Sequence, residues 1–156
     1  MEGLVCAQRE IGVKPEEKSP SVVYEAFDAG SHLSGVVEIC ASLEWDNFRY
    51  DPDLTRRSLT APGVTAIIAV AREPGDVVGF AQVFGDGVLQ AHLGLLAVDE
   101  KWRRGNIGRG LVEEAFARLG AERMDLISSD QSLDFYRSFK HREQAGFRIY
   151  PGRKTD

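Results

Sequence analysis

Hydrophobic positions along this chain follow two different periods, and the change from one to the other marks the predicted elements. Helical spacing, with apolar residues three and four apart, runs through 32–45 and 107–119. Short apolar runs typical of strands occupy 22–27, 65–72, 77–84, 88–98 and 124–128. Further short elements are predicted as helices over 53–59 and 133–139. At the end of the chain, either 140–143 is a short strand and 147–150 the last strand, or the last strand is missing. Ser31 is the expected cap of the first helix, and Gly120 the expected end of helix 107–119.

The order of these elements predicts an α+β fold with a mixed, mainly antiparallel central sheet flanked by helices. Turn residues at 73–76 and 85–87 join three successive antiparallel strands. Strand 88–98, helix 107–119 and strand 124–128 then form a β-α-β unit, whose two strands should be parallel. Gly94 interrupts the first of these strands, which indicates either a bulge near Gly94–Leu96 or a close approach of another backbone.

Length and composition set the limits of this prediction. A chain of 156 residues suits one domain, which we place at 21–151. A charged, proline-marked leader or tail precedes it at 1–20, and a short tail follows at 152–156. The net charge of −5 argues against nucleic acid as a partner. The two cysteines lack metal-site spacing, and we find no apolar run long enough for a membrane span, so we expect a soluble cytoplasmic protein without a metal.

A glycine-rich turn lies between strand 88–98 and helix 107–119. It consists of Arg103, Arg104, Gly105, Asn106, Ile107, Gly108, Arg109 and Gly110. The first N–H groups of a helix lack partners inside the helix, and the helix dipole attracts negative charge to them. Glycines let a bulky anion approach, and the three arginines add positive charge. The turn is therefore predicted to bind a phosphate or diphosphate.

The glycine spacing separates this turn from two common phosphate sites. A P-loop requires Gly-Lys-Ser/Thr at the start of the helix, which the chain lacks here. The dinucleotide fingerprint has the order G-x-G-x-x-G, whereas this turn has G-x-x-G-x-G. Antiparallel strands before the turn also disagree with a doubly wound sheet.

Residues 98–111 resemble the acetyl-CoA signature of the GNAT superfamily of N-acetyltransferases, Arg/Gln-x-x-Gly-x-Gly/Ala. Arg103 takes the first place, Gly108 the last, and Asn106 replaces the middle glycine. A second segment, 129–136, resembles the family's Asn-x-x-Ala-x-x-Phe-Tyr: the final Phe-Tyr pair matches, and serines stand at the other two positions. The order of elements extends the resemblance to roughly 22–150.

The resemblance implies an N-acetyltransferase that moves an acetyl group from acetyl-CoA to a primary amine by direct attack in a ternary complex. Residues 103–110 would hold the pyrophosphate. The backbone of Leu96, Ala97 and Val98 would pair with the pantetheine amides, and Tyr136 would protonate the departing thiolate. The family often forms dimers, so a homodimer is one expectation.

Several points stay open. The sequence does not choose the acceptor or the general base. The candidates for the base are His92, Glu44, His141 and Glu143, whereas Asp99 and Glu100 near the turn are interpreted as solvated or capping residues. The loop 45–53 combines aromatic and acidic residues that suit an amine, although a loop that covers the core is the slightly favoured interpretation. Two other functions also remain: a non-catalytic acetyl-CoA sensor or partner subunit, and a nucleotide-binding module.

Overall fold

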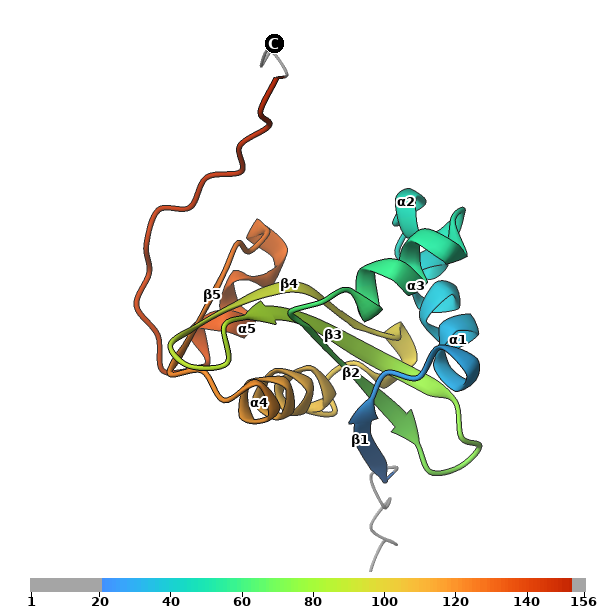
Figure 1. Cartoon of the computed structure of the whole chain (residues 1–156). Helices are drawn as coiled ribbons and strands as arrows, with labels where there is room; N and C mark the ends of the chain where they lie inside the picture. The colour runs from blue at the N-terminus through green and yellow to red at the C-terminus, as the bar shows by residue number, and fades with distance from the viewer. Residues whose placement is uncertain (1–20, 153–156) are drawn as a thin grey trace, which may run out of the picture.

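The computed structural model describes residues 21–152 as a five-stranded sheet flanked by helices (Figure 1). The strands lie in the order in which the chain makes them: β1 (Val22–Ala26), β2 (Val64–Ala71), β3 (Val77–Gly85), β4 (Gln90–Val98) and β5 (Arg123–Leu126). Neighbouring strands are antiparallel except β4 and β5, which are parallel. The predicted fold class is confirmed. The predicted tail 1–20 and residues 153–156 lie outside the described part of the chain.

The helices lie on both faces of the sheet, with α4 on one face and α1 and α3 on the other (Figure 1). They are α1 (Ala29–Ser42), α2 (Asp46–Arg49), α3 (Pro52–Thr60), α4 (Ile107–Leu119) and α5 (Leu133–Arg137), with 3-10 turns η1 (Glu100–Trp102) and η2 (Asp130–Ser132). Successive side chains of β2 point to opposite faces of the sheet. Ile67 and Ala69 pack under α4, whereas Ile68 packs under α1 and α3. All three side chains are fully buried.

Glycines in β3 let α4 approach the sheet closely. A Cβ on Gly79 would lie 3.0 Å from the Leu111 Cδ1, and a Cβ on Gly85 would overlap the Leu119 Cδ2. Leu111 is fully buried. Two leucines of α4 therefore fill spaces that only glycine leaves open, which fixes the helix and its N-terminal turn relative to β4.

The expected bulge is present in β4. Gln82 of β3 pairs with Leu95 and Val83 pairs with Leu93, so the register skips Gly94. The parallel pairing of β4 with β5 runs from Gln90 only to Leu93. Beyond the bulge the ladder between β4 and β5 ends, and within residues 21–152 this part of β4 is paired on its β3 side alone.

Three local predictions are wrong. The N-cap of α1 is Asp28, whose carboxylate accepts a hydrogen bond from the Ser31 N–H at 2.8 Å. Because a capping side chain binds an N–H two or three residues ahead, the helix starts before the apolar pattern does. The predicted loop 45–53 contains α2. The strand predicted over 88–98 begins two residues later, at Gln90. The Asp86 carboxylate accepts the N–H groups of residues 88–90, which extends the preceding turn.

The predicted last strand, 147–150, is also wrong. Residues 141–150 form neither helix nor strand, and this segment leaves the body of the domain (Figure 1). The Phe147 and Ile149 side chains are 82% and 79% exposed. An alternating pattern favours a strand only where a partner edge binds it, and here the segment does not pair with the outer edge of β5. No helix among residues 21–152 has the length and apolar character to cross a membrane.

Candidate functional site

The turn between β4 and α4 is shaped by two residues in the left-handed backbone region. Arg104 has φ 67° and Asn106 has φ 60°, whereas the three glycines of the turn have ordinary values. Asparagine tolerates this region better than most residues. The left-handed conformation of this turn therefore falls on Arg104, which precedes Gly105, and on Asn106, which lies between Gly105 and Gly108. It does not fall on the glycines.

This turn presents unpaired donors at the start of α4. The first backbone bond of the helix runs from the Gly110 N–H to the Asn106 carbonyl at 2.9 Å. The N–H groups of Ile107, Gly108 and Arg109 precede it, so they have no acceptor within the helix. Three N–H groups at the positive end of a 13-residue helix form a site suited to a phosphate or diphosphate.

The glycines of α4 make room for side chains from other elements. A Cβ on Gly108 would lie 3.3 Å from the Phe135 ring of α5. A Cβ on Gly110 would overlap the phenol of Tyr24. Gly108 and Gly110 thus contribute to the site by letting α5 and β1 pack against the first turn of α4.

The unpaired edge of β4 leads directly into this turn. The Asp99 N–H donates to the Val78 carbonyl of β3 at 2.9 Å. Because backbone groups alternate along a strand, Leu96 and Val98 direct theirs away from β3, and Ala97 directs its own toward β3. The Val98 carbonyl accepts a 3.3 Å bond from the Arg103 Nε, which keeps a guanidinium at the end of the strand.

Tyr136 lies on α5, half-buried against the core beneath α4. Its ring meets the Phe135 ring edge-on, with 5.0 Å between centroids. Burial raises the pKa of the Tyr136 phenol above its ordinary value, so the phenol is protonated at neutral pH. A protonated phenol can donate a proton to a base formed beside it.

The Arg109 side chain turns toward α5. Its Nη2 donates to the Ser138 Oγ at 2.8 Å and to the Ser138 carbonyl at 3.0 Å, and its Cζ lies 4.0 Å from the centroid of the Phe139 ring. The sequence predicted this arginine as a cofactor ligand. Ser138 and Phe139 were missed, because they lie 29 or more residues along the chain and no local pattern links them to the turn.

The candidate bases are scattered. His92 lies on β4 two residues before the bulge, exposed and beside the Phe84 ring at 6.5 Å. Glu143 forms an exposed ion pair with Arg137 at 2.7 Å, which lowers the pKa of the Glu143 carboxyl. His141 lies beside it in the segment that leaves the domain. The remaining candidates have other places: Glu44 follows α1, Asp99 caps η1, and Glu100 begins η1.

The loop 45–53 covers the core, as its slightly favoured interpretation predicts. The Trp45 ring packs edge-on against Phe80 at 6.3 Å. Each carboxylate has a partner within the loop and α3: Asp46 pairs with Arg49, and Asp51 caps α3. Asp53 pairs with Arg56 and Arg57. These carboxylates are thus already engaged.

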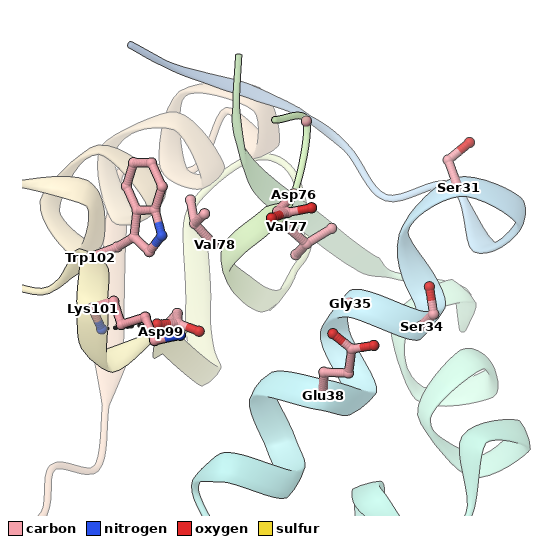
Figure 2. Close-up of a pocket in the computed structure, with 11 residues that line it drawn as sticks. Ser31, Ser34, Gly35, Glu38, Asp76, Val77, Val78, Asp99, Lys101 and Trp102 are labelled. Carbon is pink, nitrogen blue, oxygen red and sulfur yellow. Dashed lines mark hydrogen bonds between the residues drawn. The ribbon is translucent and has the colours of Figure 1, made fainter. Parts of the chain in front are cut away.

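A polar pocket of about 460 Å³ lies between α1 and η1, beside the β2–β3 turn (Figure 2). Carboxylates from three elements line it: Glu38 of α1, Asp76 of the β2–β3 turn and Asp99 after β4. Lys101 and Trp102 of η1 complete the wall that adjoins the turn. None of its lining residues belongs to α4, α5 or β5, so this pocket is separate from the first turn of α4 and from Tyr136.

Comparisons with known proteins agree with this geometry. The family description "Acetyltransferase (GNAT) domain" matches residues 65–142, which is half of the chain. No curated protein matches the chain.

Many solved structures share the fold. An acetyltransferase from Trypanosoma brucei is 21% identical, with a TM-score of 0.61, over 83% of this chain and 99% of its own. A GNAT family acetyltransferase from Streptococcus pneumoniae is 21% identical, with a TM-score of 0.63, over 86% and 98%. An aminoglycoside acetyltransferase from an uncultured soil metagenomic sample is 24% identical, with a TM-score of 0.64, over 85% and 97%.

The structural similarities show the fold, and the matched domain, which contains β2 to β5, the turn and α5, shows the family. The chain belongs to the GNAT acetyltransferases.

Proposed function

We propose that this protein transfers an acetyl group from acetyl-CoA to a primary amine of a small molecule or peptide, by direct attack of the amine in a ternary complex. The observation that carries the proposal is the divergence of β4 from β5 after the Gly94 bulge. It leaves a strand edge open beside the N–H groups that begin α4. An extended chain with amides and a diphosphate would find both kinds of partner there.

The backbone groups of Leu96 and Val98 are our candidates for the pantetheine amides. The backbone N–H and carbonyl of Ala97 point toward β3, so Ala97 would not bind pantetheine directly and would only separate the two binding residues along the strand. The N–H groups of Ile107, Gly108 and Arg109 would hold the pyrophosphate, with Arg103, Arg104, Gly105, Asn106 and Gly110 shaping the turn. Positive charge would come mainly from Arg103 and Arg104.

When bound, acetyl-CoA supplies a thioester whose carbonyl an amine can attack. The protein's part is to supply a proton to the sulfur that leaves, and Tyr136 is our candidate donor. Burial keeps its phenol protonated, and α5 rests on the turn that would hold the pyrophosphate. The amine must lose a proton, and the exposed His92 near the bulge is one candidate to accept it.

A ligand screen followed by an acceptor screen tests this function. Thermal-shift measurements with CoA, NAD and ATP come first, because a ligand that binds only the folded state stabilises it by RT ln(1 + [L]/Kd) and so raises the Tm. A panel of aminoglycosides, amino sugars, polyamines and peptides is then incubated with acetyl-CoA, and free thiol is measured. We expect a shift with CoA and thiol release with at least one amine.

Tyr136→Phe is the key variant, and Tyr50→Phe is its matched control on an exposed ring far along the chain. Tyr136→Phe should lower kcat by about 10²-fold or more, the usual contribution of a positioned acid. A shift with CoA but no thiol release with any amine would favour the non-catalytic binding protein. A shift with NAD alone would refute the acetyl-CoA site.

A further inference from the structure

We propose that Arg109 is a positioning residue, whose guanidinium anchors α5 and the Tyr136 ring on the first turn of α4. The side chain spans the two helices. Nη2 reaches two acceptors on Ser138, the Oγ at 2.8 Å and the carbonyl at 3.0 Å. Nη1 meets the Glu113 Oε1 at 3.2 Å, and the guanidinium lies over the Phe139 ring at 4.0 Å.

The anchored helix is too short to hold its own position. α5 has five residues, and isolated helices of that length are unstable in water. The end of α5 has a local hydrogen bond, from the Ser138 Oγ to the Phe135 carbonyl at 2.6 Å. Arg109 binds that same Ser138, so one guanidinium fixes the end of α5 immediately after Tyr136.

A further contact between the helices lies at Gly108, where the Phe135 ring fills the space of an absent side chain. This apolar contact sets the distance between the helices, but apolar contacts are not directional. The hydrogen bonds of Arg109 supply direction. Together they fix the orientation of the ring of Tyr136, which follows Phe135 in the chain.

The same contacts argue against Arg109 as a direct phosphate ligand. Three of its five N–H donors already serve Ser138 and Glu113, and the Glu113 carboxylate offsets its charge. A phosphate that bound through both terminal nitrogens would have to displace these partners. We therefore expect Arg109 to affect turnover through Tyr136 and to affect CoA binding little. This inference rests on the proposed role of Tyr136 as the proton donor.

Two arginines of α4 give a matched pair for the test. Arg118 also pairs with a glutamate four residues away, Glu114 at 2.8 Å, and also donates to a backbone carbonyl, that of Tyr24 at 3.0 Å. It lies at the far end of α4. Arg109→Gln and Arg118→Gln therefore remove similar contacts from the same helix, and only the first should release α5.

The first measurement needs no acceptor. The tyrosine phenols of the full-length protein are titrated by ultraviolet absorbance, and each variant is compared with its own Tyr136→Phe counterpart to isolate Tyr136. We expect the raised pKa of Tyr136 to fall toward about 10 in Arg109→Gln and to stay unchanged in Arg118→Gln. Calorimetric titration with CoA should give a Kd within about 3-fold of the wild type for both, less than the roughly 10-fold that corresponds to a lost charged hydrogen bond.

Milder variants guard against a folding defect. Ser138→Ala removes only the Oγ acceptor, and Arg109→Lys keeps a positive charge without the planar fork. Both should shift the titration in the same direction as Arg109→Gln, by a smaller amount. A CoA Kd raised tenfold or more in Arg109→Gln, with the Tyr136 titration unchanged, would overturn the proposal and restore Arg109 as a phosphate ligand.

Once an amine acceptor is known, a double-mutant cycle separates the two hypotheses. We expect Arg109→Gln to lower kcat about tenfold or more, since small misplacements of a catalytic group are costly, and to have no further effect in Tyr136→Phe. If Tyr136→Phe lowers kcat and Arg109→Gln lowers it again by its full factor, the positioning role is wrong. If Tyr136→Phe leaves kcat unchanged, the proposed proton donor is wrong, while the titration still decides the anchor.

Discussion

The left-handed backbone at Asn106 predicts a graded response to substitution. Its φ of 60° and ψ of 8° lie in a region that glycine and asparagine adopt readily and β-branched residues resist. Replacing Asn106 by Gly, Ala and Val leaves the charge of the turn unchanged, because all four side chains are neutral. The series therefore tests the backbone geometry alone.

The expected magnitudes follow from the cost of this conformation. A left-handed conformation costs an ordinary side chain roughly 1–2 kcal/mol, so Asn106→Val should lower the free energy of unfolding by an amount in that range. For a chain of this length the Tm should fall by about 2–8 °C. Asn106→Gly should stay within about 0.5 kcal/mol of the wild type, since relief of strain is offset by a more flexible unfolded chain. Asn106→Ala should lie between them.

Binding of CoA should follow the same order. A ligand at one hundred times its Kd stabilises a protein by about 2.7 kcal/mol. If the turn must keep its left-handed residue to present the N–H groups of α4, Asn106→Val should lose most of the Tm increase caused by CoA. Asn106→Gly should keep it or increase it.

Glu44 provides the matched control. It has φ 57°, is exposed, and lies in the connection that follows α1. Glu44→Gly and Glu44→Val should reproduce the difference in stability between glycine and valine without changing the response to CoA. An Asn106→Val protein as stable as the wild type, or one that binds CoA equally well, would show that the turn geometry does not govern the site.

Three further predictions concern packing and pH. Leu111→Ala should cost about 2–5 kcal/mol in urea denaturation, because the side chain is fully buried over Gly79; a loss below about 1 kcal/mol would contradict that packing. Gly110→Ala should lower the free energy of unfolding by about 1–2 kcal/mol. In a protein that already carries Tyr24→Leu, Gly110→Ala should leave the free energy of unfolding unchanged, because the overlap with the phenol is removed. Burial raises the pKa of the Cys40 thiol from 9.0 to about 11, so folding disfavours the thiolate and stability should fall by about 2 kcal/mol as pH rises from 9 to 11. Cys40→Ala should show a flatter dependence on pH over that interval.

Elements whose causes are local could be predicted from the sequence. Helix 107–119 was expected with the bounds that the structure gives α4, since an apolar stripe runs through it and Gly120 ends it with φ 76°. The bulge at Gly94 was also predictable, because a glycine within an apolar strand marks a break in the ladder. The parallel pairing of β4 and β5 followed from the intervening helix.

Features that depend on distant partners could not be predicted. Residues 147–150 have a strand-like pattern, but a strand needs an edge to pair with, and the pattern does not report whether β5 offers one. The cap of α1 was misplaced by three residues, because Asp28 and Ser31 are both good capping residues and the apolar pattern begins closer to Ser31.

The predicted site stays a prediction, and the structure adds contacts that the sequence did not indicate. The sequence placed three arginines at the turn and assigned them all to the cofactor. The contacts of Arg109 with Ser138 and Phe139 depend on how α5 folds back over α4, which no spacing in the sequence encodes. Charge near a turn predicts an anion site, but the tertiary partners decide which charges remain available to it.

The one irregular position of the signature has a physical explanation. The family pattern requires glycine at the position of Asn106 and glycine or alanine at Gly108. The first position needs a left-handed backbone, which asparagine tolerates, so Asn106 preserves the turn. The second position has an ordinary backbone, but a Cβ there would lie 3.3 Å from the Phe135 ring, a contact that a methyl group can make with a small shift and a larger side chain cannot. The two positions select residues for different reasons, conformation at one and space beneath α5 at the other, and the departure in this chain falls where conformation alone decides.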